Sequence, residues 1–325
     1  MKKLTVFMIV LTTVAAMFTG CSPAGAGSAA DGGGQTYVTV ATGGSSGAYY
    51  ALGGTIANLL NQNVENMNAS VQSTGASAVN STLIGQGKVE LAFAMNDVVN
   101  YAYTGTETFS DKEAVANLRG VAALYPNFVQ LVTLEGTGVL EVSDLAGKRV
   151  GVGAPGSGTE VNARQILSAH GISYDDIDED FLSYAEAVEQ LKNGAVDAAF
   201  LTSGIPNSAI MDLATTKDVK IVPIRKDVVE ALAEDFPFYT SEMIPAGTYD
   251  NTEDVETAAV TTLLVTNADV DEELVYEMTK TIFENLDALG QTHSSGKKIS
   301  LDKVRIGMPI PLHSGAEKYF AELGK

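Results

Sequence analysis

A strand–turn–helix pattern that occurs twice most limits what this chain can fold into. Residues 37–41 alternate as a β-strand does, the glycine-rich stretch 42–47 breaks the strand, and apolar residues then recur at helical spacing. About 110 residues later, a strand at 149–152, a glycine-rich turn at 153–159 and a second helical pattern follow in the same order. The repetition predicts two lobes of similar construction.

The similarity extends beyond the two turns. Residues 87–96 align with residues 194–203, and both segments read as buried strands that follow a helix, at 76–85 and 185–193 respectively. Each half then reads strand, helix, strand, helix, strand, which is typical of a mostly parallel sheet with right-handed crossovers. Two unrelated segments could share this pattern by chance, and the α/β class would still hold. We predict an α/β fold of two lobes, each a mostly parallel sheet flanked by helices, with a ligand cleft between them.

Two apolar strands bracket the second copy and indicate where the chain changes lobes. They lie at 120–133 and 219–224. The chain is expected to enter the second lobe near the first strand and to leave it near the second, so that two crossings form a hinge. The expected division is lobe one at 36–130 and 223–325, and lobe two at 131–222.

Length and composition agree with two packed lobes and exclude some classes of partner. Of the 325 residues, 45% are hydrophobic and 18% are charged, which fits an ordinary packed protein. The net charge of −20 would repel phosphate backbones, so we expect no binding to nucleic acid. A small ligand is not excluded, because a few donors in a closed cleft outweigh a screened surface charge.

The chain offers no pattern for a disulfide, a metal or a cofactor. Its one cysteine, Cys21, allows neither an internal disulfide nor a multi-cysteine zinc site, and its three histidines are isolated in sequence. A GxGxxG match at 151–156 contains Pro155, which removes a backbone amide where a pyrophosphate needs a donor. We therefore predict neither a metal nor a cofactor.

The N-terminus reads as an export signal. Two lysines precede an apolar run, residues 4–18, which is shorter than the roughly 20 residues that span a bilayer as a helix. Residues 18–21, FTGC, resemble the lipobox of bacterial lipoproteins. We therefore expect removal of a signal peptide at 1–20, acylation of Cys21 and an extracytoplasmic location, with a plain secretory signal as the alternative. Residues 21–35 are rich in glycine, alanine and serine and are expected to form a flexible tether.

The two glycine-rich turns are the first candidates for a binding site. In open α/β sheets ligands bind beyond the carboxyl ends of the strands, where both turns fall. Glycines let the backbone approach a ligand, and free amides at a helix N-terminus receive a carboxylate. The candidates are Ser46, Gly47, Ser157, Gly158 and Thr159. A tight turn with a capping hydroxyl is the structural alternative, but two matching turns on two lobes favour a ligand clamp.

Further candidates are expected at the same edge of the sheets. They are Tyr49, Tyr50, Thr74, Gly75, Asn96, Asp97 and Ser203. One of the two tyrosines would close the pocket while the other packs in the core. Thr74 could equally be a plain helix cap, and Asp97 could receive a ligand ammonium group or cap a helix. The arginines nearest to the turns are Arg149 and Arg164, so an anionic ligand is expected to be held by neutral donors and helix ends.

The first turn also allows an enzymatic interpretation. Residues 43–47 match GxSxG between a strand and a helix, which would make Ser45 the nucleophile of a serine hydrolase. His293 or His313 could complete a triad in the order serine, acid, histidine. Because turns rich in glycine and serine match this pattern readily, we prefer binding to catalysis.

Several longer blocks occur in the order of one known family. They read TGGSSGAYYALGGTIANLLN, VQSTGASAVN, ELAFAMND, LRGVAALYPNFVQLV, DLAGKRVGVGAPGSGTEVNARQIL and PLHSGAEKYFAELG. Over residues 37–324 the chain resembles the TAXI-type solute receptors of TRAP transporters. The resemblance implies a two-lobed periplasmic-binding fold of type II and a ligand such as glutamate, glutamine or another small carboxylate. It also implies delivery of that ligand to a sodium-driven membrane permease without ATP.

The resemblance implies pocket roles for the same turns. The positions carried over are Gly47, Tyr49, Tyr50, Thr74, Gly75, Asn96, Asp97, Ser157, Gly158 and Thr159, with Ser203 as a further one. His313 is implied to be a packing element rather than a catalytic base. The single arginine that clamps carboxylates in other TRAP receptor families has no counterpart here, so the ligand cannot be inherited from them. We expect a monomer without enzymatic activity, and a lipoprotein sensory subunit with similar ligands is the remaining alternative.

Overall fold

Both copies of the repeated pattern form parallel sheets in the computed structural model, which describes residues 34–325. In the first copy, strands β1 (Thr36–Ala41), β2 (Met67–Gln72) and β3 (Leu91–Met95) lie in the order β2-β1-β3. Helices α1 (Ala48–Asn63) and α2 (Ser77–Gly85) connect them. The expected signal peptide and Cys21 lie outside the described residues, as does most of the expected tether.

The second copy repeats the order of the first. Strands β5 (Arg149–Gly151), β6 (Asp178–Asp180) and β7 (Ala198–Ser203) are parallel in the order β6-β5-β7, with helices α4 (Gly158–Ala169) and α5 (Tyr184–Asn193) as the crossovers. The apolar periodicity explains this, because α4 and α5 each bury one face against the sheet. The predicted α/β class, with parallel strands and flanking helices in each lobe, is confirmed.

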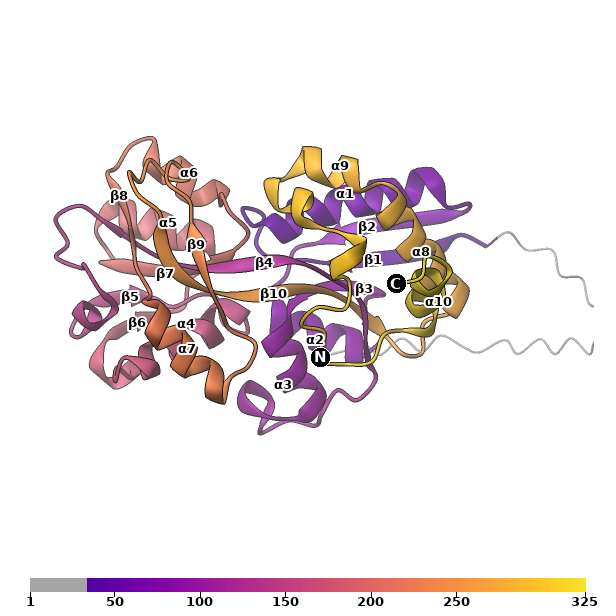
Figure 1. The fold of residues 1–325 in the computed structure, drawn as a ribbon, viewed down its shortest axis with the longest axis horizontal. Coiled ribbons are helices and arrows are strands. Elements are labelled where there is room, and N and C mark those ends of the chain that lie inside the picture. Colours follow the sequence, from indigo (N-terminus) through magenta and orange to yellow (C-terminus); the bar gives the residue numbers. More distant parts are fainter. Residues whose placement is uncertain (1–33) are drawn as a thin grey trace, which may run out of the picture. The chain divides into compact units, whose positions relative to one another are not determined.

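Two long strands join the lobes into one ten-stranded sheet. β4 (Leu118–Leu134) and β10 (Val255–Asn267) run antiparallel to each other. In the first lobe, part of β10 pairs with β3. In the second lobe, part of β4 pairs with β7. Each long strand therefore belongs to both lobes. Figure 1 shows both strands passing between the two groups of helices. They are buried over nearly their whole length, as expected for central strands covered on both faces.

The chain returns to the first lobe later than the sequence analysis expects. The strand β8 (Val219–Val222) is followed by helix α7 (Lys226–Asp235), which packs on α4, and by strand β9 (Thr240–Ile244), which pairs with residues 255–259 of β10. The backbone N–H of Ile224 also donates to the carbonyl of Glu256 at 3.0 Å. Residues 223–259 therefore belong to the second lobe, and the return crossing lies inside β10 rather than near residue 223.

The remaining helices complete the two lobes. They are α3 (Asn96–Thr104), α6 (Ser208–Ala214), α8 (Glu272–Glu284), α9 (Leu286–Thr292) and α10 (Ser314–Glu322). α8 and α9 pack on α1, and α10 packs on α8. His313 caps α10, because its Nδ1 accepts the N–H of Gly315 at 3.2 Å while its Nε2 bonds the carbonyl of Val270 at 3.0 Å. This histidine thus has a packing role, as the family resemblance implies.

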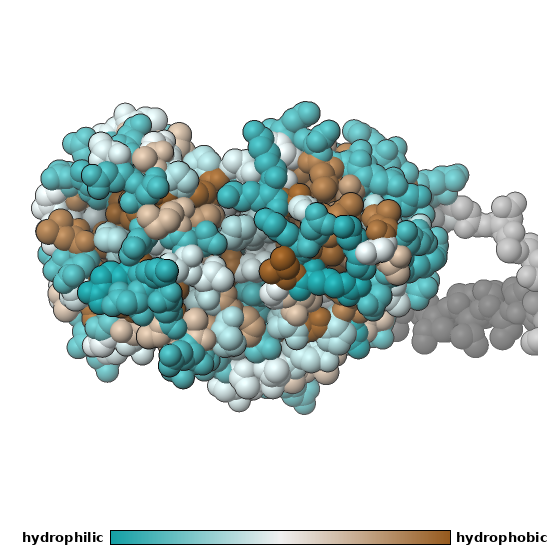
Figure 2. Space-filling view, in the orientation of Figure 1, coloured by the Kyte–Doolittle hydropathy of each residue, from teal (hydrophilic) through white to brown (hydrophobic). Residues whose placement is uncertain are grey.

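The apolar core continues from one lobe to the other. One cluster of buried residues contains Met95 and Val98 of the first lobe together with Val161 and Ile166 of α4. The lobes therefore meet through apolar side chains as well as through the shared strands. Large exposed hydrophobic side chains come from separate segments, and Figure 2 shows a face on which hydrophilic residues predominate. Within residues 34–325, no helix combines the length and the apolar character needed to cross a membrane.

Candidate functional site

A cavity lies between the two lobes, where the strands of both copies end. The loop after β1 and the start of α2 form its wall on the first lobe, while the loop after β5, the start of α5 and the end of β7 form the opposite wall. Its empty space is about 600 Å³ with the mouth included, but only about 70 Å³ can hold the centre of a water molecule. The cavity is therefore a narrow slot, at the edge where open α/β sheets bind ligands.

Four helix N-termini contribute to this slot: those of α1, α2, α4 and α5. No side chain caps α1 or α2. Ser157 caps α4 by accepting the N–H of Glu160 at 3.2 Å. The other N–H groups of the first turn have no acceptor within the helix. Each N-terminus carries a partial positive charge. The slot therefore favours an anionic group without the help of a basic side chain.

Most of the residues predicted from the sequence line this cavity. They are Gly47, Tyr49, Thr74, Gly75, Ser157, Gly158, Thr159 and Ser203. They come from segments far apart in the chain, and the structure brings them to one place from both lobes. Their roles as ligand contacts remain predictions.

Tyr49 and Tyr50 differ clearly in position. Tyr49 lines the cavity, is 7% exposed and stacks on Phe93 with 5.1 Å between the ring centroids. Its hydroxyl accepts a hydrogen bond from Nδ2 of Asn127 at 2.8 Å, and burial raises its pKa well above the ordinary value. Tyr50 is half-buried and is not part of the cavity wall. Of the two predicted tyrosines, only Tyr49 is placed to meet a ligand in this conformation.

Ser46 and Asn96 also lie outside the cavity wall. The carbonyl of Ser46 accepts a hydrogen bond from the hydroxyl of Ser208 at 2.8 Å, which links the first glycine turn to α6 of the second lobe. The amide of Asn96 bridges two backbone segments, accepting from the N–H of Thr261 at 3.0 Å and donating to the carbonyl of Gly307 at 3.1 Å. Both residues hold backbone segments in place.

Asp97 lies behind the cavity and faces the other lobe. It is fully buried, and its Oδ2 accepts a hydrogen bond from Nδ2 of Asn162, on α4, at 2.8 Å. Burial raises the pKa of this carboxyl to about 6, although hydrogen bonds from the Val98 backbone and from Asn162 partly oppose the shift. In this conformation Asp97 links the lobes and does not contact the slot.

The link continues as a buried polar network. Nδ2 of Asn162 also donates to the hydroxyl of Tyr239 at 2.8 Å, and that hydroxyl donates to Oε1 of Gln165 at 2.7 Å. Nε2 of Gln165 in turn donates to the hydroxyl of Tyr101 on α3 at 3.1 Å. Helices α3 and α4, one from each lobe, are thus joined twice by buried hydrogen bonds.

Two glycines allow the backbones of the lobes to approach closely. A Cβ at Gly158 would lie 2.3 Å from Sδ of Met95 and 3.0 Å from Oγ of Ser77. A Cβ at Gly75 would lie 3.2 Å from the carbonyl oxygen of Pro155. Beside them, the N–H of Ala78 donates across the cleft to the carbonyl of Gly156 at 3.1 Å. The structure therefore shows the lobes in contact above the cavity, which is a closed arrangement.

The sequence analysis missed several residues of the wall. The main ones are Asn127, Ser183, Tyr184 and Thr202. Asn127 lies in the middle of an apolar strand, and a polar residue at such a position could have been recognised in the sequence as a candidate site residue. Ser183 forms a capping box with Glu186 at the start of α5, a pattern visible in the sequence. Burial raises the pKa of Tyr184 to about 12, so its hydroxyl stays protonated at neutral pH.

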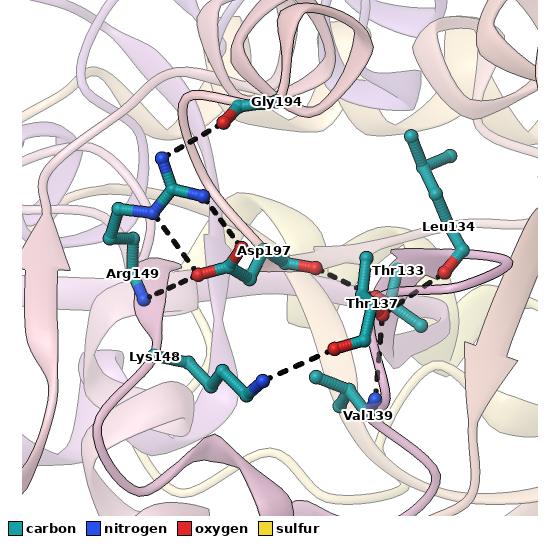
Figure 3. A network of polar contacts seen from close by, with 8 residues as sticks. All are labelled: Thr133, Leu134, Thr137, Val139, Lys148, Arg149, Gly194 and Asp197. Atoms are coloured by element: carbon teal, nitrogen blue, oxygen red, sulfur yellow. Dashed lines mark hydrogen bonds and ion pairs between the residues drawn. The ribbon is translucent and has the colours of Figure 1, made fainter.

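The arginines nearest to the turns are occupied elsewhere. Figure 3 shows the guanidinium of Arg149 against the carboxylate of Asp197, with N···O distances of 2.6 and 3.1 Å, and against the carbonyl of Gly194 at 2.8 Å. Arg164 pairs with Glu160 at 3.3 Å. Among the described residues that line the cavity, none carries a formal charge.

The described residues give the hydrolase interpretation no geometric support. Ser45 is exposed and does not line the cavity. Nδ1 of His293 accepts the N–H of Ser295 at 3.1 Å, and His313 is engaged at the start of α10. Within residues 34–325, no three histidine, cysteine or acidic side chains gather as a metal site would require.

Solved structures with a similar fold include several binding proteins. The ligand-binding component of an ABC-type import system from Staphylococcus aureus matches with a TM-score of 0.51 and 11% identity, over 89% of this chain and 92% of that one. A protein of Bordetella bronchiseptica RB50 matches with a TM-score of 0.52 and 18% identity, over 89% and 80%. The periplasmic aliphatic sulphonate-binding protein SsuA from Escherichia coli gives 0.49 and 14%, over 88% and 82%.

The comparison with protein families covers most of the chain. The model of the NMT1-like family matches residues 40–324, which include both lobes and every residue of the cavity wall. The two structures with TM-scores above 0.5 agree with the fold described above. This chain belongs to the NMT1-like family.

Proposed function

We propose that this protein is an extracytoplasmic solute-binding receptor that captures a small carboxylate or amino acid between its lobes. The observation that carries the proposal is the slot itself, which helix N-termini from both lobes line without any charged side chain. Such a wall offers neutral donors to an anionic group from two sides. A small ligand held this way would contact both lobes at once.

Binding would favour the closed arrangement. A ligand shifts an equilibrium between open and closed states only by its difference in affinity for the two. A ligand that bridges the lobes meets its second wall only when they close, so its affinity for the closed state is higher. The strands β4 and β10 are the two connections about which the lobes would rotate.

We further propose that the closed receptor delivers its ligand to a TRAP-type permease driven by sodium, and that Cys21 carries a lipid anchor. The support is the resemblance of the sequence blocks to TAXI-type receptors and of residues 18–21 to a lipobox. The similar structure from Staphylococcus aureus is described as part of an ABC-type system, which is the alternative kind of partner.

An uptake experiment tests the partner. If the permease is of the TRAP type, uptake of the ligand by cells that express receptor and permease together should require a sodium gradient. Uptake that persists without the gradient would contradict a TRAP partner.

A thermal-shift screen tests the receptor function. The purified protein is heated with glutamate, glutamine, aspartate, 2-oxoglutarate, succinate or neutral amino acids. A ligand at about 100 times its dissociation constant adds about 2.7 kcal/mol to the free energy of unfolding. We expect a clear rise in melting temperature with one chemical class. A folded sample, freed of co-purified ligand, that responds to none of them would contradict the proposal.

A further inference from the structure

The cavity wall contains a buried hydrogen-bond acceptor without a partner. Asn127, on β4, has no exposed surface and lines the slot, and its Oδ1 accepts no hydrogen bond from any described residue. Oγ1 of Thr202, on the neighbouring strand β7, is in the same state. Folded proteins rarely leave buried polar atoms unpaired, because the lost hydration is not replaced. Six buried side-chain atoms of the described residues are in this state, and these two are the ones in the cavity wall, where a ligand can satisfy them.

Tyr49 contacts the amide of Asn127. Nδ2 of this amide donates one hydrogen to the hydroxyl of Tyr49 at 2.8 Å, and the Tyr49 ring is held by stacking on Phe93. In this orientation of the amide, Oδ1 is the atom without a partner and is left for the ligand. This differs from the helix N-termini around the slot, which present N–H donors.

The wall is thus complementary to a molecule with two different ends. Helix N-termini would bind a carboxylate, and Oδ1 of Asn127 requires an N–H donor. Because no lining residue is charged, an ammonium group would be held by neutral acceptors, as the carboxylate is held by neutral donors. A dicarboxylate or a 2-oxo acid offers no hydrogen to Oδ1 and leaves it unpaired.

We infer that Asn127 determines specificity: it selects α-amino acids over the 2-oxo acids and dicarboxylates of similar size. This rests on the proposed receptor function and deepens it by naming the ligand class. A site built around a hydrogen bond discriminates strongly against an analogue that cannot form it, because the buried partner is then left unsatisfied. The hydroxyl of Thr202 can donate or accept, so the selection rests on Asn127.

Matched ligand pairs test the inference by calorimetry. Glutamate and 2-oxoglutarate share a carbon skeleton, but glutamate carries an amine where 2-oxoglutarate carries a carbonyl group. Leucine and 4-methyl-2-oxopentanoate form a second pair of this kind. The wild-type protein should bind the amino acid of at least one pair roughly tenfold or more tightly than its oxo acid. Asn127→Leu should abolish that preference, whereas Asn127→Asp keeps an acceptor and should keep or increase it.

The control is Asn267→Asp, the same chemical change at a buried amide on β10 outside the cavity wall. It should leave the preference unchanged. Each result is the ratio of two affinities measured in one variant. A general loss of stability lowers both affinities together and leaves this ratio unchanged. If Asn127→Leu does not fold, Asn127→Asp alone decides.

Three outcomes would overturn the inference, and they are distinguishable. Equal binding of both members of each pair by the wild type shows that the wall does not select an amine. Loss of amino-acid binding in Asn127→Asp shows that the amide presents its NH₂ group, and the receptor function still stands. Failure of the wild type to bind any of the four ligands overturns this inference, whereas the proposed receptor function fails only if the wider thermal-shift screen is also negative.

Discussion

Asp97 is a buried carboxyl group that contributes to the pH dependence of stability. Its pKa rises from 3.8 to about 6 because the carboxyl is fully buried. The folded protein therefore binds this proton more tightly than the unfolded chain does, and stability falls as pH rises from about 4 to 6. A shift of about two pKa units corresponds to a penalty on the order of 3 kcal/mol at neutral pH.

Asp97→Asn should remove this penalty. The amide oxygen can still accept the hydrogen bond from Asn162, and the side chain no longer ionises. The free energy of unfolding of the variant minus that of the wild type should rise by about 2–3 kcal/mol between pH 4 and pH 7. Urea denaturation at several pH values measures this difference. Asp212→Asn, the same chemical change at an exposed position on α6, is the matched control, and a pH profile of Asp97→Asn that does not differ from that of Asp212→Asn would contradict the argument.

At the scale of elements, the start of α4 carries the contact between the lobes. Gly158→Ala would place a methyl group 2.3 Å from Sδ of Met95 on the other lobe. The buried Met95 side chain would have to shift between the lobes, which disfavours the closed arrangement, so ligand affinity should fall by roughly tenfold, which is about 1.4 kcal/mol. Calorimetry measures the affinity, and X-ray scattering detects a more open average structure.

Gly54→Ala is the matched control within α1. Nothing lies within 4 Å of a Cβ at this position. Replacing a helical glycine by alanine in open space should stabilise the protein by about 0.5–1 kcal/mol and leave ligand affinity unchanged. If Gly158→Ala behaved like Gly54→Ala, close approach of the lobes would not be needed for binding.

At the scale of the whole molecule, the lipid anchor proposed at Cys21 can be tested directly. Cys21→Ser removes the thiol that acylation needs, so the protein should move from the membrane fraction to the soluble extracytoplasmic fraction. Cell fractionation followed by mass measurement of the mature N-terminus tests this. Ligand affinity should not change, because every residue of the cavity wall lies beyond residue 42. A mature N-terminus of the wild-type protein that lacks the mass of an acyl group would contradict the lipid anchor.

Local patterns were sufficient to predict the strand–helix repeats and eight of the nineteen residues of the cavity wall. The alternation in 37–41 and the helical spacing that follows it depend on neighbouring residues only. The glycine turns fall at the carboxyl ends of strands by the geometry of parallel sheets. For these reasons Gly47, Gly75 and Gly158 could be assigned to one cleft without a structure.

The tertiary structure decided the features that depend on distant pairing. The lobe assignment of residues 223–259 depends on how β9 and β10 pair, and no local pattern fixes an antiparallel register at that distance. The burial of Asp97 follows from the approach of α4, and the open acceptor of Asn127 follows from the position of Tyr49. Sequence determined which segments form strands, helices and turns, because those follow from periodicity. Only packing determined which polar groups face a ligand and which face the other lobe.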